Sequence, residues 1–215
     1  MHRARFAHWV ILLFIFLGSV HAEAASRSLQ KIFTRPLIIG ASVSSGLLVE
    51  GPGTIATRAV MGSDTSLNIA RNGAQGRYFQ NINGESLKEY SLVIGVDFVF
   101  WDSINDDVTE SLTAIQNLIR SAQQANVPLV LGDVPALSSR QNESSRRALN
   151  QRIRSLCRPK NGCRLLPLDR IHEIANGPGL VIEGQVYHYS DLTIDGIHLN
   201  LTGSRYLAGQ ILEIL

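Results

Sequence analysis

Residues 37–44 read Leu-Ile-Ile-Gly-Ala-Ser-Val-Ser, and this stretch decides the fold class. Its three aliphatic residues form a short apolar run, which is typical of a strand buried on both faces of a parallel sheet. Ligands of open parallel sheets bind beyond the carboxyl ends of the strands. Ser42 follows the run after Gly40 and Ala41, so its hydroxyl lies where function is expected, although a Ser at this point also fits a helix N-cap.

Short β-rich runs recur along the chain and alternate with segments of helical period. After the first run we expect strands at residues 66–70, 92–101, 127–131 and 164–168. Such alternation is typical of a parallel sheet covered by helices. The sequence therefore predicts an α/β fold.

Three segments between and after these runs predict helices. The clearest, after the third run, has an apolar face and acidic residues in its first turn; the face comprises Val108, Leu112, Ile115, Leu118, Ile119 and Ala122. A second helix is predicted at residues 143–156, and we expect the arginines on its polar side to face solvent. Residues 202–215 predict a closing helix, and residues 180–189 a hairpin that turns at Glu183-Gly184.

The N-terminus predicts export. Basic residues precede an apolar run at 9–17, and small residues follow up to Ala25, which is the order of a secretory signal. We therefore expect a signal peptide at 1–25 and a single domain at 26–215. A retained membrane anchor is the alternative, but the apolar run is shorter than the roughly 20 residues that a spanning helix needs. No later stretch predicts a membrane span.

Charge and cysteine content exclude some classes of site and partner. The formal net charge is +2 and no block of like charges is present, so nucleic acid is not an expected partner. Cys157 and Cys163 are the only cysteines, and in an exported chain this pair is a candidate disulfide, with two free thiols as the alternative. Neither has a nearby His at metal-ligand spacing, so no metal is expected.

A second chemical motif, Asp195-Gly-Ile-His198-Leu-Asn, precedes the closing helix. A three-residue step lets the Asp carboxylate reach one imidazole nitrogen, which fixes the tautomer and leaves the other nitrogen free to face a nucleophile. The alternative is a capping role for Asp195 and a merely exposed His198.

The two motifs together resemble the SGNH hydrolases, also called GDSL esterases and lipases: Gly-x-Ser-x-Ser after the first strand and Asp-Gly-x-His-Leu before the last helix. The resemblance implies a three-layer α/β/α sandwich with a parallel sheet of about five strands. It also implies a catalytic triad of Ser42 as nucleophile, His198 as base and Asp195 as its partner. The chain departs from the family in having Ala41 where GDSL enzymes have Asp.

The family's oxyanion hole is matched in part. Amides of Ser42 and of Gly73, in the loop after the second strand, correspond to two of its donors, although a plain turn glycine is the alternative for Gly73. The third block, Gly-x-Asn-Asp, is altered here. Asn105 is the candidate third donor but lies far beyond the strand, whereas Asp97 and Asp102 lie closer and cannot donate when ionised.

The resemblance implies an esterase that forms an acyl-enzyme and needs no cofactor, with a small-molecule or glycan ester as substrate. Two alternatives remain: an O-acyl transferase or deacetylase of envelope glycans, and a non-catalytic binding module with this fold. Of the other histidines, we expect a structural role for His172, and His188 is a candidate for lining a substrate pocket.

Overall fold

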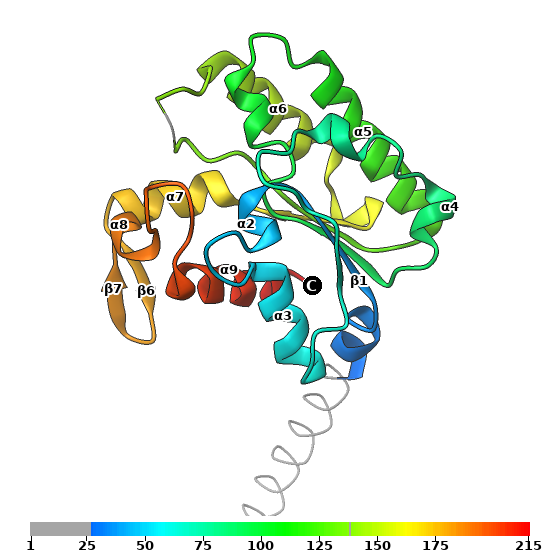
Figure 1. The fold of residues 1–215 in the computed structure, drawn as a ribbon, viewed down its shortest axis with the longest axis horizontal. Coiled ribbons are helices and arrows are strands. Elements are labelled where there is room, and N and C mark those ends of the chain that lie inside the picture. Colours follow the sequence, from blue (N-terminus) through cyan, green and yellow to red (C-terminus); the bar gives the residue numbers. More distant parts are fainter. Residues whose placement is uncertain (1–26, 138) are drawn as a thin grey trace, which may run out of the picture.

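The computed structural model describes residues 27–137 and 139–215, and its centre is a five-stranded sheet (Figure 1). The strands run in the order β2-β1-β3-β4-β5 and every pairing is parallel. Their bounds are β1 Pro36–Ile39, β2 Leu67–Asn68, β3 Leu92–Gly95, β4 Leu129–Gly132 and β5 Cys163–Leu166. The predicted α/β sandwich with a parallel sheet of about five strands is confirmed.

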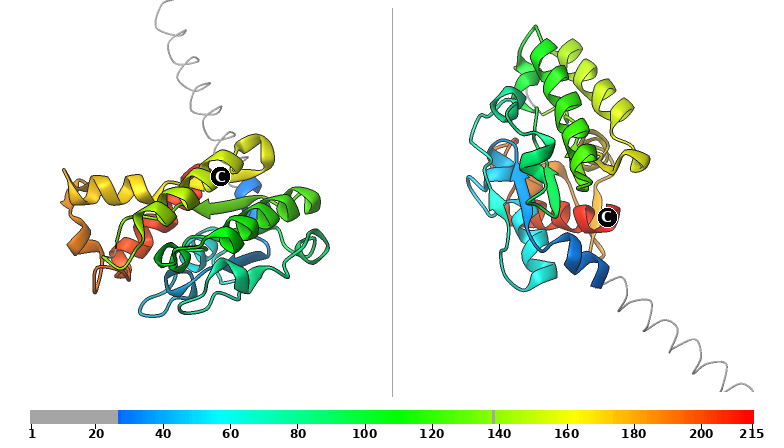
Figure 2. Two further views of the ribbon diagram at one scale, coloured as in Figure 1. Left: turned by 90° about the horizontal axis from the view of Figure 1, so that it is seen from above. Right: turned by 90° about the vertical axis from the view of Figure 1, so that its right-hand side faces the viewer.

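Helices cover both faces of the sheet (Figure 2). Helices α5 and α6 lie on one side, and α3 and α9 lie on the other. The α-helices are α2 Ser42–Ser45, α3 Pro52–Met61, α4 Gly84–Leu87, α5 Thr109–Ala125, α6 Glu143–Leu156, α7 Leu168–Asn176, α8 Tyr189–Leu192 and α9 Leu201–Ile214. Three 3-10 helices are η1 Gly76–Phe79, η2 Trp101–Ile104 and η3 Pro159–Asn161.

The side chains of each strand point alternately to the two faces of the sheet, and this divides the hydrophobic core into two clusters. Ile39 and Val93 pack in the cluster that includes the apolar faces of α5 and α6. Their neighbours Leu92 and Ile94 pack in a second cluster with Ala56 of α3 and residues of α9. Because successive side chains of a strand point to opposite faces, strands that are apolar throughout can hold both helix layers.

All strands after the first are shorter than predicted: β2 covers only two of residues 66–70, β4 begins at Leu129, and the third and fifth strands end early. The third ends at Gly95, and residues 98–104 form a turn and η2 instead of continuing the strand to 101. Two buried carboxylates beyond the strand explain this bend: Asp97 bonds amides of α2, and Asp102 bonds the Gly76 amide. The fifth strand ends at Leu166, because Leu168 begins α7. Neither α3 nor α7 was predicted.

A two-stranded hairpin lies outside the main sheet. Strands β6 Leu180–Ile182 and β7 Gln185–Tyr187 pair antiparallel, and the two turn residues Glu183 and Gly184 both have positive φ, as a type I′ turn requires. Leu180 packs with α7 and α8 in a small third cluster.

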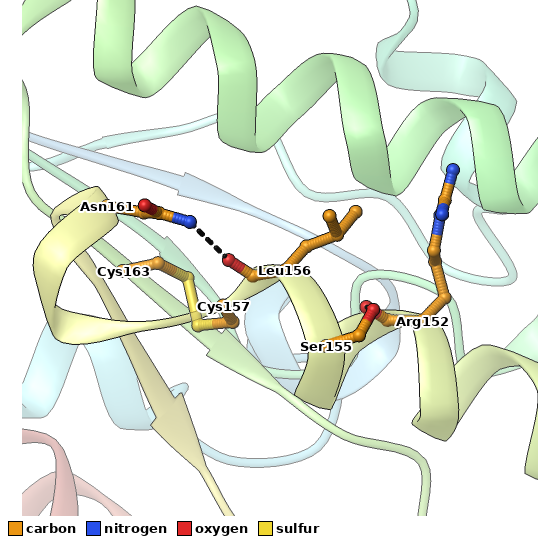
Figure 3. The surroundings of a disulfide bond; sticks show 6 residues. All are labelled: Arg152, Ser155, Leu156, Cys157, Asn161 and Cys163. Atoms are coloured by element: carbon orange, nitrogen blue, oxygen red, sulfur yellow. Dashed lines mark hydrogen bonds between the residues drawn. A yellow bond between two sulfur atoms is a disulfide. The ribbon is translucent and has the colours of Figure 1, made fainter.

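A disulfide joins Cys157, at the end of α6, to Cys163, at the start of β5 (Figure 3). Beside it, Asn161 donates from Nδ2 to the Leu156 carbonyl at 2.9 Å. The bridge thus fixes the tight turn through η3.

The predicted signal peptide lies outside the described residues. Within the described part of the chain, none of the helices combines the length and the apolar character that crossing a membrane would take.

Candidate active site

Ser42 stands at the start of α2, directly beyond the carboxyl end of β1, and is almost fully buried. Gly40 makes the sharp turn between strand and helix with a φ of +131°. A Cβ on Gly40 would lie 2.5 Å from the Asp97 carboxylate and 2.6 Å from the Ser44 hydroxyl. Both the backbone angle and the crowding therefore require glycine here.

Asp97 holds this turn from the neighbouring strand. Its Oδ1 accepts the Ala41 amide at 2.8 Å and the Ser44 hydroxyl at 2.5 Å, and its Oδ2 accepts the Val43 amide at 2.9 Å. The Ser44 amide also donates to Oδ1, at 3.3 Å. Burial raises the pKa of Asp97, and the four hydrogen bonds oppose that rise. The carboxylate acts as a clamp on the backbone on both sides of Ser42.

Asp195 and His198 form a compact pair in the loop before α9. The Asp195 Oδ1 accepts the backbone amides of Ile197 and His198, at 3.0 and 2.7 Å, and its Oδ2 lies 2.7 Å from His198 Nδ1. Hydrogen bonds from the His198 amide and ring lower the pKa of Asp195 to about 2. Gly196 permits the tight turn between them through its φ of +79°.

The other ring nitrogen of His198 reaches Ser42. Nε2 lies 3.0 Å from the Ser42 Oγ, across 156 positions of sequence. With Nδ1 donating to Asp195, Nε2 is free to accept the hydroxyl proton. The structure thus brings together the three side chains that the sequence singles out, in an arrangement that can activate a hydroxyl nucleophile.

Gly73 lies in the loop after β2, which is tied to α2 by two side chains. Asn68 donates to the Ser44 carbonyl at 3.0 Å, and Asn72 accepts from the Ser45 hydroxyl at 2.7 Å. Gly73 itself has a φ of +70° and open space around the position of a Cβ. Within residues 27–137 and 139–215, the amides of Ser42 and Gly73 have no hydrogen-bond acceptor. Both can serve as oxyanion donors.

The structure gives no support to Asn105 as a third donor. It ends η2, and its carbonyl accepts the Ser145 hydroxyl of α6 at 2.5 Å. It is not among the residues that line the pocket at Ser42. The bend after β3 explains the difference, because it directs residues 101–105 toward α6 instead of along the strand axis.

Asp102 supports the loop that carries Gly73. Its Oδ2 accepts the Gly76 amide at 2.9 Å, and its Oδ1 accepts the Ser111 hydroxyl of α5. Burial raises the pKa of Asp102, and these hydrogen bonds oppose the rise. The sequence did not predict the positioning roles of Asp97 and Asp102; the one available signal was two acidic residues within an otherwise apolar run after a strand.

Ser42 opens into an apolar cavity of about 70 Å³ between the ends of β3 and β4 on one side and α7, α8 and α9 on the other. His172 lines it, with its ring edge-on to Tyr189 at 4.6 Å and its Nε2 2.7 Å from the Asn176 amide nitrogen. Burial lowers the pKa of His172. His188 lines a different, shallower hollow beside α8.

The described part of the chain holds no group of three or more His, Cys, Asp or Glu side chains arranged to bind a metal ion.

Comparison with known proteins gives structural relatives only. No family model matches the sequence, and no curated protein matches it. Among solved structures, esterase EstA from Pseudoalteromonas sp. is 15% identical with a TM-score of 0.55, over 84% of this chain and 96% of that one. A GDSL-like lipase from Bacteroides thetaiotaomicron is 16% identical with a TM-score of 0.55, over 84% and 88%.

The acetylxylan esterase Axe2 from Geobacillus stearothermophilus, solved as a catalytic mutant, is similar to the same extent: 13% identical, with a TM-score of 0.58, over 84% of this chain and 93% of that one. These likenesses span nearly the whole described chain and concern the arrangement of its elements. Taken with the sheet order, they establish that the chain has the fold of the SGNH hydrolases.

Proposed function

We propose that this protein is an exported serine hydrolase that cleaves carboxylic esters through an acyl-enzyme. The observation that carries the proposal is the continuous contact from Asp195 through His198 to Ser42, with distances of 2.7 and 3.0 Å. The names of the structural neighbours, which include esterases and a lipase, agree with ester chemistry.

The reaction follows from the geometry. Ser42 Oγ attacks the ester carbonyl carbon while its proton passes to His198 Nε2. The amides of Ser42 and Gly73 donate to the developing oxyanion. The carbon–oxygen bond to the alcohol then breaks, and the alcohol takes the proton from Nε2.

Release of the acyl group repeats these steps with water. The water attacks the acyl carbon, gives its proton to Nε2, and the acid leaves as Ser42 regains its hydrogen. Throughout, Asp195 stabilises the imidazolium that forms at His198. Export agrees with the disulfide at Cys157–Cys163, since such bonds persist in oxidising compartments.

The first test is hydrolysis of p-nitrophenyl esters by the mature protein, with Ser42→Ala and His198→Ala as inactive variants. We expect turnover by the unaltered enzyme, covalent labelling of Ser42 by a fluorophosphonate, and a fall to background in both variants. Ser45→Ala is the matched control, because that hydroxyl bonds the Ser42 carbonyl and Asn72 and does not reach His198.

An unaltered protein that neither hydrolyses esters nor accepts the fluorophosphonate would favour a non-catalytic binding module. A hydrolase whose acyl group passes mainly to an added alcohol or sugar would instead be an acyl transferase. Export is tested separately by the mass of the secreted chain, which we expect to begin between Glu23 and Ser26.

A further inference from the structure

We propose that the apolar cavity beside Ser42 binds the acyl part of the substrate, and that it fits an unbranched aliphatic acyl group of about four carbons. This inference rests on the proposed ester hydrolysis and adds to it the chemical class of the acyl group. The cavity is continuous with the nucleophile, since Ser42 and the adjacent Val43 are part of its wall.

The wall of the cavity is apolar over most of its area, and many of its residues are aliphatic. Val96 and Val134 contribute from the ends of β3 and β4, Leu168 and Ile171 from α7, and Leu180 and Leu192 from the hairpin and α8. Apolar surface of this kind binds hydrocarbon because burial removes it from water. An acyl chain attached to Ser42 would extend directly into it.

Three of the polar side chains in the wall already have partners. Asp97 is held by the turn at Ser42. The side chain of Asp133 is fully buried, accepts two hydrogen bonds from Arg154 and accepts the Asp169 amide. The Tyr189 hydroxyl donates to the Gly196 carbonyl at 3.3 Å. A ligand rich in hydroxyl groups would find few free partners here, so the cavity favours an aliphatic group over a sugar.

The size of the cavity limits the chain length. Its volume is about 70 Å³, roughly half of the 150 Å³ that admits benzene in a protein core. It therefore holds about three carbon atoms beyond the carbonyl, which corresponds to a butanoyl group. The far side of the cavity is formed by α7, the hairpin and α8, whose buried residues pack together in the third hydrophobic cluster.

The expected specificity follows from transfer free energies. Each methylene that enters the cavity should raise kcat/KM by about fourfold. From acetate to butanoate esters we therefore expect a rise of about 15-fold. Beyond the capacity of the cavity the gain should stop, and kcat/KM should fall for decanoate and longer esters.

A matched pair of variants on α7 tests whether the acyl group binds in this cavity. Ile171 lines the cavity, whereas Ile174 packs in the same helix and cluster without lining it. Ile171→Ala removes carbon atoms from the wall, so the preferred chain should lengthen by two or more carbons and the octanoate-to-butanoate ratio should rise at least tenfold. Ile174→Ala should keep the unaltered preference.

A second measurement needs no variant. Labelling of the unaltered enzyme by p-nitrophenyl alkylphosphonates should accelerate from methyl to propyl and then slow for longer alkyl groups. An acetate optimum, a rise that continues through decanoate, or equal shifts in both isoleucine variants would overturn the acyl-cavity inference while leaving ester hydrolysis intact. Absence of all hydrolysis and labelling would instead overturn the proposed function itself.

Discussion

Replacing Asp97 with Asn should separate the positioning of Ser42 from the stability of the fold. The carboxylate uses both oxygens on the turn: Oδ1 accepts from Ala41 and Ser44, and Oδ2 accepts from Val43 at 2.9 Å. An Asn of the same shape keeps one acceptor oxygen. Its NH₂ group must then face either the Val43 amide or the donors on the other side.

The expected change in the free energy of unfolding follows from the hydrogen bonds that are lost and from the removal of a buried charge. Losing a hydrogen bond to a charged acceptor costs about 1.5–3 kcal/mol, and the amide left without an acceptor costs about 1–3 kcal/mol more. The same substitution removes a buried charge whose pKa burial raises, which offsets part of this loss. We therefore expect the free energy of unfolding to fall by only about 2 kcal/mol.

Catalysis should suffer more than stability does. Repulsion between the new NH₂ group and the donors that it faces displaces the turn next to the nucleophile, and a shift of about 1 Å in a catalytic group costs about 10²-fold in rate. We expect kcat on p-nitrophenyl butanoate to fall about 10²-fold at 25 °C with little change in KM, and the rate of fluorophosphonate labelling to fall in parallel. Circular dichroism at the same temperature establishes that the variant is folded.

Ile153→Ala provides the control for stability alone. Ile153 lies on the buried face of α6, and truncating it should lower the free energy of unfolding by about 2–5 kcal/mol. The kcat of the folded variant should nevertheless equal that of the unaltered protein. If Asp97→Asn also keeps the unaltered kcat, the clamp on the nucleophile turn is not needed for catalysis and the reasoning fails.

Three further predictions concern other parts of the molecule. Gly40→Ala should abolish ester hydrolysis and lower the free energy of unfolding by about 3 kcal/mol or more, because the φ of residue 40 is +131° and the new Cβ would clash with Asp97. Gly209→Ala in α9 is the control: the position of its Cβ is open space, so this substitution should raise the melting temperature slightly. Asp195→Asn should lower kcat about 10³- to 10⁴-fold by favouring the wrong His198 tautomer. The pKa of Asp195 is lowered from 3.8 to about 2, so its ionised form stabilises the fold above pH 4, and that contribution is lost as the pH falls through 2. The melting temperatures of Asp195→Asn and of the unaltered protein should therefore converge between about pH 4 and pH 2. A constant difference between the two melting temperatures would contradict the assignment. Replacing both Cys157 and Cys163 with Ser should lower the free energy of unfolding by about 2 kcal/mol without changing kcat, as measured by urea denaturation and by ester hydrolysis.

Local signals explain why some elements could be predicted from the sequence. Helix α6 has the predicted bounds, because Asn142 caps its first turn through the Ser145 amide and apolar residues recur at helical spacing. The hairpin turn at Glu183-Gly184 is likewise set by two adjacent residues. Ser42, Asp195 and His198 were singled out because their two motifs together resemble those of the SGNH hydrolases, one after the first strand and one before the last helix.

Tertiary packing explains the elements that were missed. Gly51-Pro52-Gly53 is typical of a turn, yet it starts α3, with Pro52 in the first turn and Gly53 against Ile38, where a Cβ would lie 3.1 Å from the Ile38 Cδ1. The apolar residues after Gly95 are buried as pocket wall and not as strand. Periodicity alone cannot distinguish these two kinds of burial.

The same limit applies to Asp97. From the sequence its carboxylate could be judged only as a poor oxyanion donor. Its four hydrogen bonds to the turn depend on β1 and β3 lying side by side, with Ile39 paired to Gly95. That pairing joins residues more than fifty positions apart, which no local pattern encodes.

The part of the cavity wall formed by the hairpin and α8, and the loop that carries Asp195 and His198, come from one continuous piece of chain, residues 180–199. This piece forms its own hairpin and packs largely in the third cluster, outside the five-stranded sheet. Insertions, deletions or exchanges within its first half can therefore reshape the acyl cavity while the sheet and its two main clusters remain intact. Exchange of this segment as one unit is therefore a route by which the shape of the cavity can change without any change to the sheet.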